Sequence, residues 1–377
     1  MAQWQFPVID CDGHLVESIP EMTEFMSPHL RQSVLGSGRQ REGAFPSLDG
    51  FHGPRIRGAK EPTGDEPPYV TASSHRKGSA EDFVAFLEKA GVDEAVIFTS
   101  EGLSVGFIQN AEYAVAICRA YNDYVFDRYA RVSDRLHPMA LIPFQDPAQA
   151  KLELRRAVKD LGFPGAMIPS SGLPLHIGHE YYMPVYEEAA NLDCVLGVHG
   201  GSVMGIGMDT FTARRAISGT HHSIGLLLGL TSIIGHGVME RFANLRVGFF
   251  EGGCAWLVLL LDRMERHERV TGRIHVGTLT ECLGNGRILI GCEGNDGSLV
   301  HLVQRVGADV FSWASDYPHE VDLEAAKQMI RDTVDDNRLS AADKGALLGS
   351  NAQRFFKLPA TGRREAQAIP AGQVQHA

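Results

Sequence analysis

Short, mainly apolar runs recur along the chain, and segments of helical length separate most of them. These runs are centred near residues 8, 96, 139, 167, 196, 248, 290 and 313. Apolar runs of this length, bounded by polar or glycine-rich turns, are typical of strands buried on both faces. Amphipathic patterns predict helices over residues 80–90, 111–129, 146–160, 182–191, 223–242 (interrupted near Gly235 and Gly237), 255–267 and 298–306, with two more beginning at Leu323 and Ser340.

Strands that alternate with helices imply a parallel sheet. Eight such units fit a closed (β/α)₈ barrel, or TIM barrel. A doubly wound open sheet is the alternative, but no glycine-rich GxGxxG turn follows the first strand. We therefore expect an α/β protein with one barrel over residues 1–358 and extra helices at its C-terminal end.

The length of the chain agrees with one elaborated domain. A bare barrel needs about 250 residues, whereas this chain has 377. The segment 35–80 is rich in Gly, Pro and charge, which predicts a surface insertion after the first strand, either a lid or a subunit contact. Residues 359–377 predict a polar C-terminal tail.

Composition narrows the choice of partners. Lys and Arg number 35 against 46 Asp and Glu, a net charge of −11, and there is no basic run. This balance argues against nucleic acid and membrane surfaces as partners. The most apolar stretch, residues 223–234, is too short to span a bilayer. The six cysteines form no CxxC pair and no signal peptide is evident, so we expect buried, reduced thiols in a cytoplasmic protein.

Candidate chemistry gathers where the predicted strands end. In a β/α barrel the active site lies at the carboxyl ends of the strands. Five strands end there in carboxylates or imidazoles, namely Asp12, His14 and Glu17, then His199, Glu251, Glu293, and finally Asp316 and His319. Asp, Glu and His are the usual ligands of Zn²⁺, Mn²⁺ and Fe²⁺. Their gathering at one rim predicts a metal site.

Spacing supports a first coordination shell. Asp12 and His14 lie two residues apart, so both point to one side of an extended strand. His199 and Asp316 would complete the shell from the opposite wall. Each residue alone has a plainer explanation, such as a helix cap for an aspartate or a favourable place near a helix N-terminus for Glu17. The joint occurrence at one rim favours the metal.

Six segments, taken together and in order, resemble the amidohydrolase-related family, a branch of the amidohydrolase superfamily. They are DCDGHLVE, RLHPMALIPFQDP, LGVHGG, MERFANLRVGFFEGGCAWL, CEGNDG and SWASDYPHE, within residues 6–358. The resemblance implies a metal-dependent barrel in which Asp12, His14, His199 and Asp316 match ligand positions. Members include decarboxylases of aromatic acids and semialdehydes, and hydrolases of C–N, C–O or C–C bonds. It also implies a homodimer, or a hetero-oligomer with a related subunit.

One position departs from the family pattern. The decarboxylases end strand six in a catalytic His-Gly-Gly, whereas this chain has Glu251-Gly-Gly. The exchange removes a proton-shuttling imidazole and adds ligand capacity. With Glu17, Glu293 and His319 nearby, the carboxylates would repel one another unless cations neutralised them. The chain is in this respect similar to dinuclear Fe/Fe or Mn/Fe non-haem hydroxylases of the family.

We therefore expect a metal-dependent hydrolase or lyase, a decarboxylase or a C–C or C–N hydrolase, that acts on a small organic, carboxylate-bearing substrate through a metal-bound water. It would use one or two divalent ions per chain, Zn, or Fe and Mn if dinuclear. Asp316 would be ligand and general base, His236 or His222 would assist proton transfer, and Glu293 would contact substrate. The alternatives are a dinuclear oxygenase that hydroxylates a C–H bond and a non-catalytic barrel, which the intact ligand positions disfavour.

Overall fold

The structure is a computed structural model that describes residues 4–35, 44–46, 78–201, 205–208, 219–271, 276–319 and 321–359. Most of the predicted insertion 35–80 and nearly all of the predicted tail 359–377 lie outside these ranges. Their assignment as a lid, a subunit contact or a tail therefore stays a prediction.

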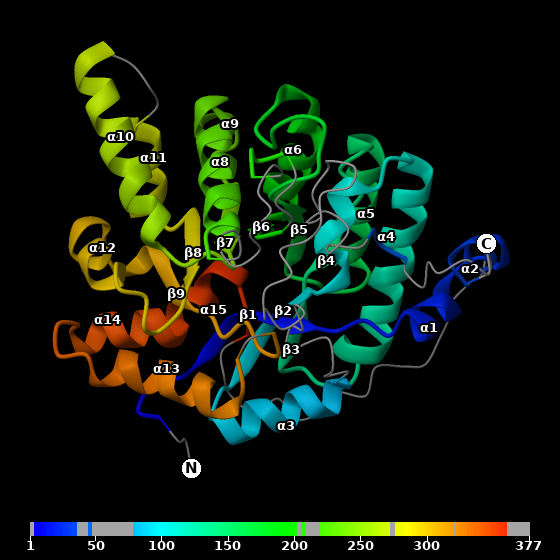
Figure 1. The fold of residues 1–377 in the computed structure, drawn as a ribbon, viewed down its shortest axis with the longest axis horizontal. Helices are drawn as coiled ribbons and strands as arrows, with labels where there is room; N and C mark the ends of the chain where they lie inside the picture. The colour runs from blue at the N-terminus through cyan, green and yellow to red at the C-terminus, as the bar shows by residue number, and fades with distance from the viewer. Residues whose placement is uncertain are drawn as a thin grey trace, which may run out of the picture.

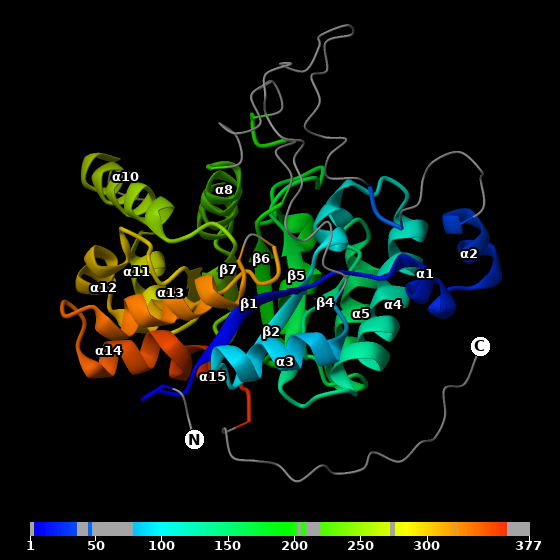
Figure 2. The same cartoon turned by 60° about the horizontal axis from the view of Figure 1, so that its bottom comes forward.

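Parallel strands form the centre of the molecule, and helices surround them (Figures 1 and 2). The strands are β1 (Ile9–Leu15), β2 (Glu94–Thr99), β3 (Leu136–Pro138), β4 (Ala140–Leu141), β5 (Gly165–Pro169), β6 (Val195–His199), β7 (Arg246–Phe250), β8 (Ile288–Cys292) and β9 (Phe311–Trp313). They pair in the orders β1-β2-β3 and β4-β5-β6-β7-β8-β9, always in parallel. Strands β3 and β4 together form one barrel strand that is interrupted at Met139. Counted in this way, the strands occupy the eight predicted barrel positions.

The helices are α1 (Ile19–Met22), α2 (Pro28–Leu35), α3 (Ala80–Ala90), α4 (Ala111–Val125), α5 (Pro147–Lys159), α6 (Met183–Leu192), α8 (His221–Gly235), α9 (Val238–Arg241), α10 (Ala255–Thr271), α11 (Val276–Gly284), α12 (Leu299–Val306), α13 (Leu323–Asp335), α14 (Ala341–Gly345) and α15 (Asn351–Phe356). Shorter helical turns are η1 (Thr23–Phe25), η4 (Glu101–Phe107), η5 (Phe126–Ala130), η6 (Glu180–Tyr182), η7 (Ala308–Val310) and η8 (Ala346–Ser350). The predicted (β/α)₈ barrel with extra C-terminal helices is confirmed.

Local sequence explains several helix ends. The side chain of Asp146 accepts hydrogen bonds from two backbone N–H groups of α5, as a helix cap does. The predicted helix 223–242 divides into α8 and α9 at Gly237, whose φ of 67° ends the regular helix. Helix α11 was not predicted, because its Gly277, Thr278 and Thr280 have low helix propensity.

The barrel closes between β1 and the segment that follows β9. The N–H of Asp316 donates to the carbonyl of Asp12 at 2.8 Å, and the N–H of His14 donates to the carbonyl of Tyr317 at 2.7 Å. Strand β1 also changes its register with β2 between Asp10 and Gly13, which marks a bulge. The closure therefore brings the ends of the first and last strands into direct backbone contact.

Aromatic rings fill the barrel beneath the carboxyl ends of the strands. The rings of Phe98 and Phe250 lie 5.1 Å apart, and that of Phe98 lies 4.8 Å from the ring of His199. A Cβ added at Gly197 would lie 3.1 Å from an atom of each phenyl ring. The glycine therefore makes room for a packed floor under the strand ends.

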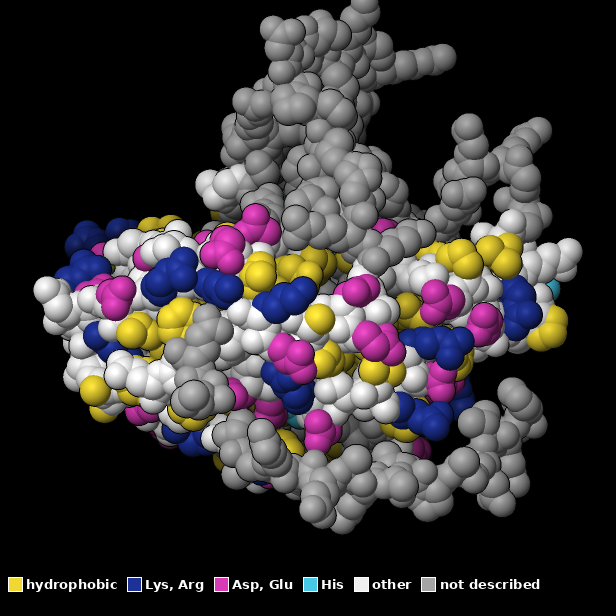
Figure 3. Space-filling view, turned by 90° about the horizontal axis from the view of Figure 1, so that it is seen from below, with side chains coloured by type: hydrophobic (Ala, Val, Ile, Leu, Met, Phe, Trp, Pro, Cys, Tyr) yellow, Lys and Arg dark blue, Asp and Glu magenta, His cyan; other side chains and the backbone are white. Residues whose placement is uncertain are grey.

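All six cysteines are buried and none forms a disulfide, as predicted. Within the described residues, no helix is long and apolar enough to cross a membrane. On the face shown in Figure 3, acidic and basic side chains are interspersed rather than gathered by sign. That face thus has the mixed charge expected from the composition.

We expect Gly197→Ala to lower the free energy of unfolding by about 1–3 kcal/mol, because the added methyl overpacks the phenyl floor. Urea denaturation followed by circular dichroism measures the change. Gly235→Ala is the matched control, since no described atom lies within 4 Å of the added Cβ there. Equal stability of Gly197→Ala and the parent would contradict the packing described above.

Candidate metal centre

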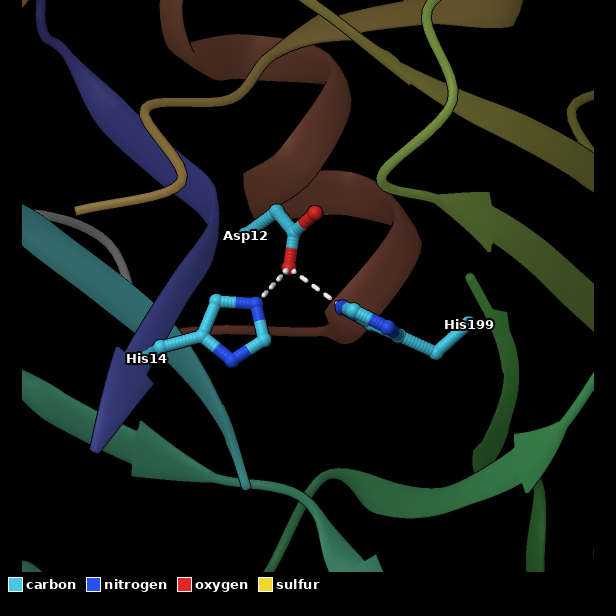
Figure 4. A group of neighbouring side chains, drawn as sticks. All are labelled: Asp12, His14 and His199. Carbon is cyan, nitrogen blue, oxygen red and sulfur yellow. Dashed lines mark hydrogen bonds and ion pairs between the residues drawn. The ribbon is translucent and has the colours of Figure 1, made fainter. Parts of the chain in front are cut away.

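Three buried side chains converge at the carboxyl ends of β1 and β6 (Figure 4). Asp12 Oδ1 lies 3.1 Å from Nε2 of His199 and 3.5 Å from Nε2 of His14. All three side chains are at most 1% exposed. The bulge in β1 and the end of β6 thus direct one carboxylate oxygen between two imidazoles.

Hydrogen bonds on the far sides of the rings define which nitrogen faces this carboxylate. Nδ1 of His14 lies 2.8 Å from the carbonyl of Thr99, and Nδ1 of His199 lies 2.9 Å from the carbonyl of Gly200. A carbonyl only accepts, so each Nδ1 carries hydrogen, and each ring, when neutral, directs the lone pair of Nε2 toward the carboxylate. Lone pairs and carboxylate oxygens that face one another fit a shared cation.

Two buried atoms at this point have no hydrogen-bond partner among the described residues. They are Nε2 of His14 and Oδ2 of Asp12. Buried polar atoms of this kind are rare in proteins, and an ion that is not included is one of the standard explanations. The donor set of nitrogen and carboxylate oxygen therefore fits a divalent cation.

Asp316 and His319 join the group from the segment after β9. Asp316 Oδ1 lies 3.4 Å from Nε2 of His14 and 2.9 Å from Nδ1 of His319. The second nitrogen of His319 lies 2.8 Å from the hydroxyl of Ser100. The two candidate cation groups, one of Asp12, His14 and His199 and the other of His14, Asp316 and His319, therefore share His14.

Glu251 lies behind His199 rather than beside Asp12. Its carboxylate oxygens lie 3.1 Å from Nδ1 of His199 and 3.1 Å from Nδ1 of His222. The structure does not bring this predicted ligand to the Nε2 side of His199, where the cation would be. A carboxylate on the distal nitrogen instead orients a ligating imidazole and raises its basicity.

Glu17 is also turned away from the group. Its carboxylate accepts hydrogen bonds from the hydroxyl of Thr99 and from the N–H groups of Ser100, Glu101 and Gly102. These four donors bind the buried carboxylate of Glu17, which the sequence predicts to be a metal ligand. The plainer explanation, a carboxylate at the positive end of a helical turn, describes its position in front of η4.

His236 and Glu293 are the other predicted residues that the structure places apart. His236 is exposed at the C-terminal end of α8, with Nδ1 2.8 Å from the carbonyl of Ser232. The helix rise puts it about 20 Å from His222, too far for proton transfer at the same centre. Glu293 is exposed in the loop after β8 and does not belong to the cation groups.

Asp10 and Ser315 belong to the surroundings of the centre but were not predicted. The Asp10 carboxylate accepts from the N–H and the hydroxyl of Ser315 and is fully buried. Burial raises the pKa of Asp10 to about 7, although the hydrogen bonds from Ser315 oppose the shift. The one signal for Asp10 in the sequence is that a carboxylate stands between the apolar Ile9 and Cys11.

The electrostatics of the centre favour a positive charge. Burial raises the pKa of Asp12 to about 6. Burial alone would lower the pKa of His199, but the carboxylates of Asp12 and Glu251 outweigh it and raise that pKa to about 9. The raised pKa of His199 thus favours a positive charge beside Asp12. Burial likewise raises the pKa of Asp316, opposed by His319.

Backbone strain marks two of these residues. Glu251 has a φ of 57° and Asp316 a φ of 55°, in the left-handed region that non-glycine residues rarely adopt. Glu251 directly follows β7, and Asp316 lies in the segment after β9. Such conformations persist where the surroundings hold them and are concentrated at functional sites.

Comparisons with known proteins identify the family of this chain. The family described as Amidohydrolase matches residues 9–358. Gamma-resorcylate decarboxylase of a Polaromonas species is 24% identical over 287 residues, which cover 73% of this chain and 86% of that protein. The structure of 5-carboxyvanillate decarboxylase from Novosphingobium aromaticivorans, complexed with manganese, is similar with a TM-score of 0.68 at 19% identity, covering 95% of this chain and 98% of that one.

An amidohydrolase structure from Mycobacterium avium subsp. paratuberculosis has a TM-score of 0.71 at 16% identity and covers 96% of this chain and 100% of that one. At these identities the solved structures show a shared fold. The family match spans the barrel from β1 to the last helix. The resemblance predicted from the sequence is confirmed, and the chain belongs to the amidohydrolase family.

Proposed function

We propose that this protein is a metal-dependent decarboxylase of a small aromatic carboxylic acid. The observation that carries the proposal is the unpartnered Nε2 of His14, which faces carboxylate oxygens of Asp12 and Asp316 in a buried site. The relatives named for gamma-resorcylate and 5-carboxyvanillate decarboxylation support the reaction class. The coarser prediction of a hydrolase or lyase includes this reaction.

Asp12, His14, His199 and Asp316 would hold one divalent cation. Manganese is the best supported choice, because two related decarboxylase structures contain it. A bound divalent cation supplies positive charge that holds and polarises anionic oxygens of a substrate. Zinc, which the sequence also suggested, has the same ligand preferences and is separated from manganese by metal analysis.

Decarboxylation needs a proton donor. The bond between the ring carbon and the carboxyl carbon breaks, carbon dioxide leaves, and the electron pair left on the ring takes up a proton. His222 is the donor that the geometry supports, since it lies in the first turn of α8 with Glu251 at 3.1 Å. Burial alone would lower the pKa of His222, but Glu251 reverses this and raises it, which favours the protonated ring that a donor needs.

This pair accounts for the departure from the family pattern. The resemblance implies an imidazole at the end of the sixth barrel strand, which is β7 here, where this chain has Glu251. Here the carboxylate comes from the strand end and the imidazole from α8. We infer that the two positions together do the work of the missing histidine.

Hydrolysis and oxygenation are the alternatives. In hydrolysis, Asp316, bonded to Nδ1 of His319, would take the proton of the attacking water. A dinuclear oxygenase has less support, because Glu17 and Glu251 are engaged elsewhere and the two cation groups share His14. The homodimer that the resemblance implies stays a prediction.

The activity itself is the first test. With Mn²⁺ present, we expect release of carbon dioxide from 2,6-dihydroxybenzoate or 5-carboxyvanillate, followed by ultraviolet absorbance and loss of substrate. Chelation of the metal and the Asp316→Asn variant should abolish it. Two Fe, or one Fe and one Mn, per chain together with substrate-dependent oxygen uptake would instead establish the oxygenase.

The proton donor has its own test. We expect His222→Gln to lower kcat by about 10²-fold or more, because a general acid contributes that much, while metal content stays that of the parent. His236→Gln is the matched control, since this histidine lies at the far end of the same helix. Full activity of His222→Gln would remove His222 from the mechanism.

Metal binding should depend on pH. Asp12, with a pKa of about 6, and His199, with a pKa of about 9, must lose their protons before they bind a cation. Affinity for Mn²⁺ should therefore rise as the pH rises from 6 to 9, by about tenfold per unit for each displaced proton. Isothermal titration in buffers of different ionisation enthalpy measures the affinity and the proton release. A pH-independent affinity would contradict the ligand assignment.

A further inference from the structure

We propose that Asp10 is a positioning residue that holds Asp12 and Asp316 in register with each other across the closure of the barrel. The inference rests on the proposed metal centre and extends it to a residue outside the ligand set. Asp10 does not itself belong to either candidate cation group. Its carboxylate contacts the segments on both sides of the closure.

On the β1 side, Asp10 supports the bulge that precedes the ligands. In the register with β2, Asp10 pairs with Ala95 and Gly13 pairs with Ile97, so β1 contains one extra residue. A bulge leaves the extra residue outside the regular ladder and redirects side chains. The N–H of Asp12 lies within this step and donates to Oδ1 of Asp10 at 3.2 Å. The carboxylate thus supplies the acceptor that the ladder lacks.

The bulge has little freedom to move. A Cβ added at Gly13 would lie 2.7 Å from the ring of Phe83 and 3.2 Å from Oδ2 of Asp10. Glycine is therefore required between Asp12 and His14 for the chain to pass this close to the carboxylate. The two ligands of β1 are consequently set by a tightly packed backbone.

On the β9 side, Asp10 holds the residue before Asp316. Its Oδ1 accepts the N–H of Ser315 at 2.9 Å, and its Oδ2 accepts the hydroxyl of Ser315. That hydroxyl oxygen also accepts the N–H of Tyr317 at 3.0 Å. Both neighbours of Asp316 are therefore tied to Asp10, one directly and one through Ser315. Asp316 lies between them in its left-handed conformation, which needs such support.

The chemistry of the contacts requires a carboxylate. Three donors, two N–H groups and one hydroxyl, point at Asp10. An ionised carboxylate only accepts and can satisfy all three. In Asp10→Asn the amide NH₂ would face the Ser315 hydroxyl, whose hydrogen would lose its acceptor. The shape and the bond from the Ser315 N–H would be kept, while the bond donated by the Ser315 hydroxyl is lost.

The test compares Mn²⁺ affinity with the stability of the metal-free protein. We expect Asp10→Asn and Ser315→Ala each to raise the Kd for Mn²⁺ by about 10–100-fold, as loss of a supporting partner does. The electron paramagnetic resonance spectrum of the bound Mn²⁺ should change as well. The double variant should be little worse than either single one, because both remove the same connection.

Asp93→Asn is the matched control. Asp93 also accepts a backbone N–H of the β1 segment, that of Val8 at 2.8 Å, but before the strand rather than at its carboxyl end. It should lower the thermal stability of the metal-free protein without changing the Kd for Mn²⁺. If Asp10 had a merely structural role, Asp10→Asn would likewise lower the thermal stability and leave the Kd for Mn²⁺ unchanged.

Three outcomes overturn the inference. Parent-like Kd and spectrum in Asp10→Asn overturn it while leaving the metal centre intact. If Asp10→Asn does not fold, parent-like Mn²⁺ binding by Ser315→Ala overturns it in the same way. If the parent itself binds no Mn²⁺, the metal centre and the positioning role both fail, and the measurement on the parent separates that case from the other two.

Discussion

The closure of the barrel between β1 and the segment after β9 is the constraint on which the rest of this structure depends. Two backbone hydrogen bonds, from Asp316 to Asp12 and from His14 to Tyr317, join the segments that carry three of the four proposed ligands. A parallel barrel has no free edge, so its last strand must meet its first. Here that meeting point is also where the ligand side chains converge. A displacement of either segment at the closure would therefore also displace the ligand side chains.

The carboxylates around the proposed metal centre differ in their partners. Asp12 and Asp316 face imidazoles and fit a cation, whereas Glu17 and Asp10 accept backbone N–H groups and hold loops in place. Glu251 belongs to neither group, because it bridges two imidazoles. A buried charge must be neutralised or hydrogen-bonded, and each of these arrangements meets that requirement in a different way.

The fold could be predicted almost entirely, and the site in part. Strand and helix periodicity are local, so the order of elements followed from them, apart from α1, α2 and α11, which were not predicted. The structure brings Asp12, His14, His199 and Asp316 together, with His319 and His222 beside them. Their residue types and places at strand ends were visible in the sequence. What could not be predicted was the direction in which each side chain points.

The sequence by itself determined the alternation of strands and helices, the rim on which polar residues gather, and the family to which the chain belongs. Only the tertiary structure decided which rim carboxylates face the proposed cation site. Glu17 and Glu251 have the same side chain, yet one accepts N–H groups after β2 and the other contacts imidazoles from β6 and α8. Those partners are remote in sequence, and the bulge in β1 and the left-handed backbone at Glu251 and Asp316 aim the side chains. Such directions depend on contacts that exist only once the barrel has closed.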